Sequence, residues 1–286
     1  MTFEYETCDV FTTTRFGGNP LAVVYGAEAL DGAAMQRVAR EFNLSETVFV
    51  LPATEGNDAF LRIFTPGVEV PFAGHPNVGA AVMLARRMGR RGRILLGQAA
   101  GLVVAELTET GGEVAGARIT APRPFARART VPAQDAAACA ALPAGAVAGE
   151  VVVGGCGLDF ALAEVADAAV LARAVPDIPA FRARMPLSVA AGLHLFTRLA
   201  PGRLRARMLT PIDGIGEDPA TGSANCALGG LLLEREGGEA LEIEVEQGVE
   251  MGRPSLLHVT ARRGADGIRV TVGGGVVPVA AGRIWV

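Results

Sequence analysis

The chain has 286 residues, a length that favours two domains, and half of them are hydrophobic, which supplies a large core. Its formal charge of −4 and scattered arginines indicate no nucleic-acid-binding face, and no apolar run reaches the ~18 residues of a membrane span. All 26 basic residues are arginines, which excludes lysine Schiff bases, lysine-anchored pyridoxal phosphate and the Walker P-loop.

The four cysteines form no CxxC pair and no cluster with histidine, so neither a structural zinc nor a disulfide framework is expected. The first residues, MTFEYETCDVF, are acidic and lack the basic and then apolar pattern of a signal peptide. We therefore expect a cytoplasmic protein without a metal or other cofactor. Its chemistry would come from carboxylates, histidine, hydroxyls, cysteine and backbone dipoles.

The first half alternates predicted strands with two predicted helices. Period-two patterns predict strands at 3–11, 47–53, 59–66 and 93–107. A helix is expected within 31–43, where Asp31 is a plausible N-cap, and a second one over 76–91. The second half repeats this composition, with predicted strands at 150–155, 160–165, 192–199, 203–211, 241–248, 256–263 and 268–274, and a helix over 223–236.

The two halves also match residue by residue. RIFTPGVEVPFAGHPNVGAA aligns with RMLTPIDGIGEDPATGSANCALGG at an offset of 145 residues that becomes 148 after an insertion. The matched pairs are Arg62 and Arg207, Thr65 and Thr210, Pro66 and Pro211, Gly74 and Gly222, Asn77 and Asn225, Gln98 and Gln247, and Cys8 and Cys156. We therefore predict a duplicated α+β fold with domains at 1–125 and 130–270, joined through a proline-containing linker, and a strand at 271–286 that could pack back on the first domain.

Each matched motif predicts a helix start with small residues, Gly74 in one and Gly222 in the other. Thr221 or Ser223 could cap the second helix. A helix N-terminus attracts anions through its unbonded N–H groups and the positive end of the dipole, so a small carboxylate is the expected ligand. Two capped core helices would explain the glycines equally well, but not the titratable groups beside them, His75 and the pair Glu217–Asp218.

A further candidate is Glu46, in EFNLSETVFVLP. It follows the first predicted helix and precedes an apolar strand, so its carboxyl could be partly desolvated at the strand's mouth. Such a group could take and return a proton near neutral pH. A solvated loop glutamate is an equally good interpretation of the local sequence.

Together the motifs FGGNPLAVV, NLSETVFV, TPGVEVPFAGHPNVGAA, EDPATGSA and EQGVEMGRPS resemble the phenazine-biosynthesis PhzF-like family of isomerases. The resemblance runs from about residue 3 to the end. It implies a diaminopimelate epimerase-like fold: two similar domains, each a sheet around a central helix, with the active site between them. It also implies a homodimer and cofactor-independent proton transfer on a small carboxylate such as trans-2,3-dihydro-3-hydroxyanthranilate.

The same resemblance assigns roles to individual residues. The residue matching Glu46 moves the proton, and His75 and Asp218 line the site and contact the substrate. Gly222 and Ser223 would receive the carboxylate. Gly74 and Asn19 are weaker candidates, as lining positions.

Other enzymes with this fold help to judge which alternative reactions the chain could catalyse. Diaminopimelate epimerases and proline racemases use two thiols, one just before each helix, whereas this chain has Ala73 and Thr221 there. A two-thiol racemase is therefore not expected, and Cys226 is interpreted as core. An epimerase or racemase of an amino-acid-like substrate on the same scaffold and a non-catalytic anion-binding protein stay open. A metal hydrolase has little support, since His194 and His258 lie in apolar or strand-like runs.

Overall fold

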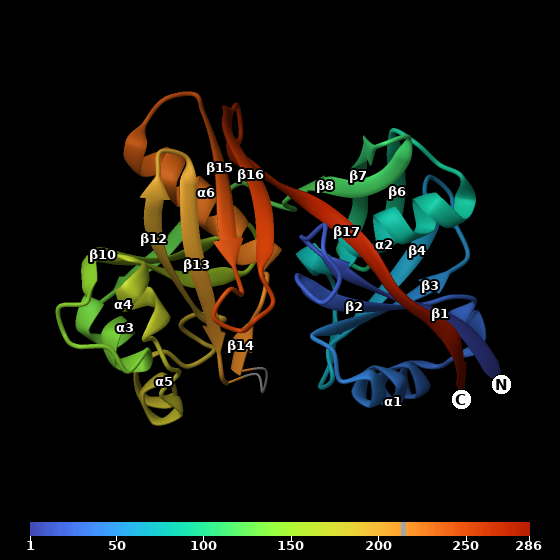
Figure 1. Ribbon diagram of the computed structural model, residues 1–286, viewed down its shortest axis with the longest axis horizontal. Helices are drawn as coiled ribbons and strands as arrows, with labels where there is room; N and C mark the ends of the chain where they lie inside the picture. The colour runs from blue at the N-terminus through green and yellow to red at the C-terminus, as the bar shows by residue number, and fades with distance from the viewer. Residues whose placement is uncertain (213–215) are drawn as a thin grey trace. The chain divides into compact units, whose positions relative to one another are not determined.

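The structure is a computed structural model that describes residues 1–212 and 216–286. It divides into two compact units, one of residues 1–120 with 273–286 and one of residues 121–272 (Figure 1). Both units mix strands and helices. None of the helices in the described part of the chain has the length and apolar character that a membrane crossing requires.

The first unit consists of nine strands or parts of strands around one long helix. Its elements are β1 (Thr2–Val10), β2 (Asn19–Val24), η1 (Ala27–Ala29), α1 (Gly32–Phe42), β3 (Glu46–Leu51), β4 (Ala59–Phe64), β5 (Glu69–Val70), α2 (Gly74–Met88), β6 (Arg93–Gln98), β7 (Gly101–Thr110), β8 (Glu113–Thr120) and the later part of β17 (Gly267–Trp285). The neighbours run β17–β1–β2–β3–β4–β6–β7–β8, and β8 pairs with β17 again, so the sheet closes.

Helix α2 lies inside this closed sheet (Figure 1) and contacts strands on several sides. Every residue from 74 to 85 is buried, because an interior helix has no face left for solvent. The fit is close: a Cβ at Gly79 would lie 2.5 Å from a Leu21 methyl carbon. Helix α1 packs outside the sheet, and its predicted N-cap is confirmed, since Asp31 accepts a hydrogen bond of 2.7 Å from the Ala34 N–H.

The second unit has the same plan. Its elements are β9 (Ala126–Val131), α3 (Ala133–Cys139), β10 (Val147–Gly155), β11 (Asp159–Val165), α4 (Ala168–Ala172), α5 (Ile178–Arg184), β12 (Leu193–Ala200), β13 (Arg203–Thr210), β14 (Gly216–Asp218), α6 (Gly222–Glu236), β15 (Ala240–Gln247), β16 (Ser255–Gly264) and the first part of β17. Strands follow in the order β9–β10–β11–β12–β13–β15–β16, and Phe125 bridges to Ile268 of β17.

Helix α6 is the counterpart of α2. It packs against β10, β11, β15 and β16, and nearly all of its first twelve residues are buried. A Cβ at Gly230 would lie 2.4 Å from the Phe125 side chain, so this glycine lets the helix approach the sheet closely.

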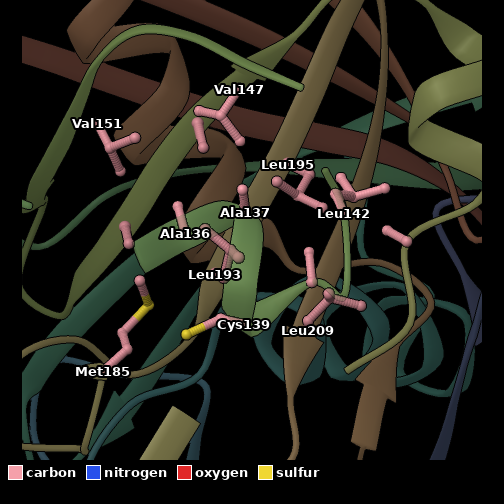
Figure 2. Close-up of a cluster of buried hydrophobic side chains, with 14 of the residues drawn as sticks. Ala136, Ala137, Cys139, Leu142, Val147, Val151, Met185, Leu193, Leu195 and Leu209 are labelled. Carbon is pink, nitrogen blue, oxygen red and sulfur yellow. The ribbon is translucent and has the colours of Figure 1, made fainter. Parts of the chain in front are cut away.

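The outer side of this sheet carries a second apolar layer. Figure 2 shows side chains of α3 packed among those of the neighbouring strands, with labelled residues Ala136, Ala137, Cys139, Leu142, Val147, Val151, Met185, Leu193, Leu195 and Leu209. The proline-containing segment expected to link the two halves, APRPFARARTVPAQDAAA at 121–138, thus contains β9 and most of α3, both elements of this unit.

Side-chain contacts repeat as well as topology. Arg62 makes a two-pronged ion pair with Glu69, with N–O distances of 2.7 Å, and Arg207 makes the same pair with Glu217 at 2.8 and 2.7 Å. In each unit the matched asparagine of the central helix bonds to the matched glutamine, Asn77 to Gln98 and Asn225 to Gln247.

One of the matched pairs is wrong. Cys8 lies within β1, opposite Leu21, whereas Cys156 lies beyond the end of β10 in the short connection to β11. The two hairpins differ in length, 11–18 against 156–158, so a constant offset does not hold across them.

Candidate functional site

Glu46 and His75 come together in the first unit. Glu46 is the first residue of β3, and His75 is the second residue of α2, just after Gly74. The Glu46 Oε2 and the His75 Nδ1 are 3.2 Å apart, with side-chain exposures of 17% and 4%. The sequence therefore places a partly accessible carboxyl against a buried imidazole at the start of the central helix.

Burial lowers the pKa of His75 to about 3, and a backbone hydrogen bond with Pro20 opposes this shift. The imidazole is thus neutral near pH 7, so its 3.2 Å approach to Glu46 is a contact between a neutral ring and a carboxyl group and not an ion pair. Glu46 therefore faces no permanent positive charge from this ring.

Asn19 directly precedes Pro20, whose backbone bonds to the His75 ring. It is the first residue of β2, is fully buried, and precedes by two residues Leu21, which pairs with Glu46 in the parallel β2–β3 ladder. Asn19, Glu46, Gly74 and His75 therefore form one cluster, which we call the first half-site.

Asp218, Gly222 and Ser223 form a second cluster in the other unit. Asp218 ends β14 and pairs with Met208 of β13. Gly222 and Ser223 are the first two residues of α6. We call these three residues, with Thr221, the second half-site.

Thr221 has a different role from the one expected of it. It occupies the N-cap position of α6, but its side chain makes no cap hydrogen bond. Its hydroxyl instead donates to Asp218 Oδ2, which orients the carboxylate. Ser223 lies inside the helix, so neither expected cap forms.

Sequence reasoning missed what holds this cluster. Gln247 of β15 donates from Nε2 to the Asp218 carbonyl at 2.8 Å and to the Thr221 hydroxyl at 3.2 Å, and its Oε1 accepts from the Thr221 N–H at 3.3 Å. Ser255 donates to the Pro219 carbonyl at 3.1 Å. The match of Gln247 with Gln98 in the sequence is the signal that points to this glutamine.

Glu217 is explained by structure alone. Its carboxylate is bound by Arg207, whose guanidinium also donates to three backbone carbonyls around α4. Glu69 is bound by Arg62 in the same way in the first unit. We call these two arginine–glutamate pairs, Arg62–Glu69 and Arg207–Glu217, the repeated frame, and Glu217 belongs to it.

The two half-sites differ at matched positions. In each unit one strand residue pairs with the matched arginine, Phe49 in β3 and Leu195 in β12. Counting back three residues from each gives Glu46 in the first unit and Gly192 in the second. The Glu46 position is thus without a side chain in the second unit.

The thiols are inert in this fold. All four cysteines are buried and free, and burial raises the pKa of Cys226 well above its ordinary value. Among residues 1–212 and 216–286, no group of three or more His, Cys, Asp or Glu side chains is arranged to hold a metal ion.

Comparison with known proteins adds a family to this geometry. A family model described as phenazine biosynthesis-like protein matches residues 8–282. Over 285 residues the chain is 36% identical to a trans-2,3-dihydro-3-hydroxyanthranilate isomerase of Pseudomonas chlororaphis, with 98% of both chains covered. It is 34% identical over 300 residues to an uncharacterized isomerase of Mesorhizobium japonicum, covering 100% of this chain and 99% of that relative.

Solved structures agree on the fold. A PhzF-family phenazine biosynthesis protein of Bacillus anthracis superposes with a TM-score of 0.90 over 100% of both chains at 22% identity. A hydroxyproline epimerase of Agrobacterium vitis gives 0.66 at 15% identity, over 99% of this chain and 91% of that one. The predicted α+β, diaminopimelate epimerase-like fold is confirmed. The chain belongs to the phenazine biosynthesis-like protein family, and it is an isomerase.

Proposed function

We propose that the protein moves a proton within a small carboxylate-bearing metabolite of the dihydro-hydroxyanthranilate type, with Glu46 as general acid/base. The observation that carries this proposal is the contact between the Glu46 carboxyl and the neutral His75 ring at 3.2 Å. Glu46 removes a proton from a carbon next to an unsaturated bond and returns a proton to another carbon. Bonds broken and formed balance, so no cofactor is consumed.

His75 and Asp218 bind polar substituents of the substrate in this proposal. His75 is held neutral by burial, and Asp218 is oriented by the Thr221 hydroxyl, so each offers a defined hydrogen-bonding group. Gly222 and Ser223, at the start of a fifteen-residue helix, receive the carboxylate through backbone N–H groups, the Ser223 hydroxyl and the helix dipole. Gly74 and Asn19 complete the lining.

The test is turnover of trans-2,3-dihydro-3-hydroxyanthranilate and related cyclic carboxylates by the wild type and by Glu46→Gln. Glu41→Gln is the matched control, because it makes the same chemical change on the exposed side of α1. We expect wild type and Glu41→Gln to convert a compound of this class and Glu46→Gln to lose it. Equal rates for all three proteins would contradict the role of Glu46.

We also propose that the protein works as a homodimer in the cytoplasm. The family resemblance of the sequence motifs supports the dimer. Sedimentation velocity at micromolar concentration should give a species of twice the 29.4 kDa chain mass. A monomer at that concentration would contradict the assembly.

A further inference from the structure

The matched asparagine and glutamine that join the central helix to the sheet make different hydrogen bonds in the two units; we call this pattern of hydrogen bonds the wiring of the pair. In the first unit the pair is reciprocal: Asn77 Nδ2 donates to Gln98 Oε1 at 3.2 Å, and Gln98 Nε2 donates back to Asn77 Oδ1 at 3.0 Å. Asn77 Nδ2 also donates to the Ala73 carbonyl at 2.8 Å. Both amide groups of this pair therefore have donors and acceptors satisfied within the pair and its helix start.

In the second unit the glutamine is turned toward the half-site. Asn225 Nδ2 still donates to the Thr221 carbonyl at 2.9 Å and to Gln247 Oε1 at 2.8 Å. The Gln247 Nε2, however, donates to the Asp218 carbonyl and to the Thr221 hydroxyl instead of to Asn225. Ala73, at the position of Thr221, has no hydroxyl, so the first unit offers its glutamine no such acceptor.

This turn leaves Asn225 Oδ1 buried without the donor that Asn77 Oδ1 has. Among the described residues it has no partner within hydrogen-bond geometry, and the same holds for both ring nitrogens of His194. His194 is fully buried on β12, one residue before Leu195. The matched position in β3, one residue before Phe49, is Val48.

The chemistry of the two orphaned groups is complementary. Burial lowers the pKa of His194 to about 4, so the ring is neutral near pH 7 and carries one N–H. The Asn225 side chain acts on that pKa in the opposite direction, as a hydrogen-bonding neighbour does. A buried carbonyl oxygen and a buried ring N–H each destabilise the folded state if left unpaired, and one hydrogen bond between them removes both penalties.

We propose that His194 is a positioning residue of the second half-site, donating its ring N–H to Asn225 Oδ1. That bond fixes the Asn225 amide, which fixes the orientation of Gln247, which in turn holds Asp218 and Thr221. The two differences between the units, Val48 against His194 and Ala73 against Thr221, are then coupled. The Thr221 hydroxyl accepts the hydrogen bond of the Gln247 amide, which therefore no longer donates to the asparagine. His194 takes the place of that amide as the donor to Asn225 Oδ1. Its effect on catalysis rests on the proposed function of Asp218, whereas the hydrogen-bond wiring does not.

The wiring is tested by a double-mutant cycle in the full-length protein. His194→Val installs the residue of the matched position, with similar volume and no N–H. It should lower Tm by roughly 3–8 °C, because Asn225 Oδ1 loses its donor. Thr221→Ala should lower Tm in the wild-type background. In the His194→Val background it should raise Tm, since Gln247 is then free to turn back and form the reciprocal pair of the first unit.

This reversal of sign is the decisive result. The control is Leu195→Ala, a cavity in the same strand on the opposite face of the sheet, where Thr221→Ala should add its own loss and rescue nothing. Additive losses in the His194→Val background would overturn the proposal. So would an unchanged Tm in His194→Val.

Activity separates positioning from plain stability. His194→Val should lower kcat/KM about tenfold, and the double variant should recover Tm without recovering kcat/KM, since Gln247 then no longer holds Asp218. His194→Gln keeps a side-chain N–H donor, so its Tm and its kcat/KM should both lie between those of His194→Val and wild type. Recovery of activity together with Tm in the double variant would contradict the positioning role. If Glu46→Gln is fully active, the proposed function fails while the Tm cycle still tests the wiring.

Discussion

The central helices α2 and α6 begin in the same way and end up with different chemistry around them. Each starts with glycine after a short strand, carries an asparagine in its first turn, and lies near a paired arginine and glutamate. The first helix start is next to an acid/base candidate, Glu46. The second has Gly192 at that position and places Asp218, oriented by a hydroxyl, where the first unit has Val70.

The difference lies in side chains that the two units do not share. Repeated contacts, such as the arginine–glutamate pairs, belong to the common fold. The proposed acid/base, Glu46, and the carboxylate of Asp218 each have no counterpart in the other unit.

The largest effect should come from exchanging the unmatched carboxyl. Glu46→Gln should lower kcat by about 10²–10⁴-fold, as loss of a general acid/base does. Adding Gly192→Glu should not restore it, because a Cβ at Gly192 would lie 2.5 Å from Met208 Cε and 2.7 Å from the Leu209 carbonyl oxygen. Steady-state rates of the single and double variants measure this, and restored activity would show that the two units are interchangeable.

The frame can be compared directly through its two arginines. Arg207 and Glu217 are 8% and 15% exposed, whereas Arg62 and Glu69 are 28% and 40% exposed. Arg207→Met should therefore cost about 3–5 kcal/mol of unfolding free energy, because it leaves a largely enclosed carboxylate unpaired and removes the donor of three backbone carbonyls. Arg62→Met should cost about 1 kcal/mol or less. Urea unfolding measures both, and equal losses would contradict the stronger burial of the second frame.

The buried histidine of the second unit should appear as a pH effect. Its pKa is about 4 when folded against an ordinary 6.5, so between these values the unfolded chain binds a proton that the folded chain does not. The stability is present in full above pH 6.5 and is lost as the pH falls toward 4. Between pH 7 and pH 5 the free energy of unfolding of His194→Val should therefore fall by about 2 kcal/mol less than that of the wild type. Parallel curves would show that His194 already titrates normally.

The smallest effect should come from the helix start that is proposed to bind the carboxylate. Ser223 matches His75 in position, one residue after the helix glycine. Ser223→Ala should raise KM by about three- to tenfold with kcat nearly unchanged, since one hydrogen bond to a charged group is lost. Initial-rate kinetics measure the two parameters separately. A fall in kcat without a change in KM would place Ser223 in the proton transfer instead.

Much of the fold could be predicted because the repeated segments contain residues with strong preferences for helix starts, helix caps and strands. Glycines at the helix starts, the Asp31 cap and the period-two strands all indicated a duplicated α+β chain. The β1–β2 connection is longer than the β10–β11 connection, and this difference makes the match of Cys8 with Cys156 wrong. An alignment at constant offset cannot detect it, because the length of a hairpin loop leaves no signal in composition.

The candidate site was predictable only in part. His75 and Glu46 are far apart in sequence, and their 3.2 Å contact depends on the β2–β3 register. Gln247 and His194 are harder to predict, because a buried polar residue within a strand has no sequence pattern of its own. Comparison of matched positions in the two units reveals the hydrogen bonds of Gln247 and underlies the proposal for His194.

The central claim is that one carboxyl, Glu46, moves the proton. The most direct measurement is deuterium incorporation from D₂O into trans-2,3-dihydro-3-hydroxyanthranilate and its product, located by NMR and counted by mass spectrometry. We expect deuterium at a single carbon of the product with wild type and none with Glu46→Gln. Incorporation that persists in Glu46→Gln would contradict it, and so would isomerisation without any exchange in a substrate pool turned over many times.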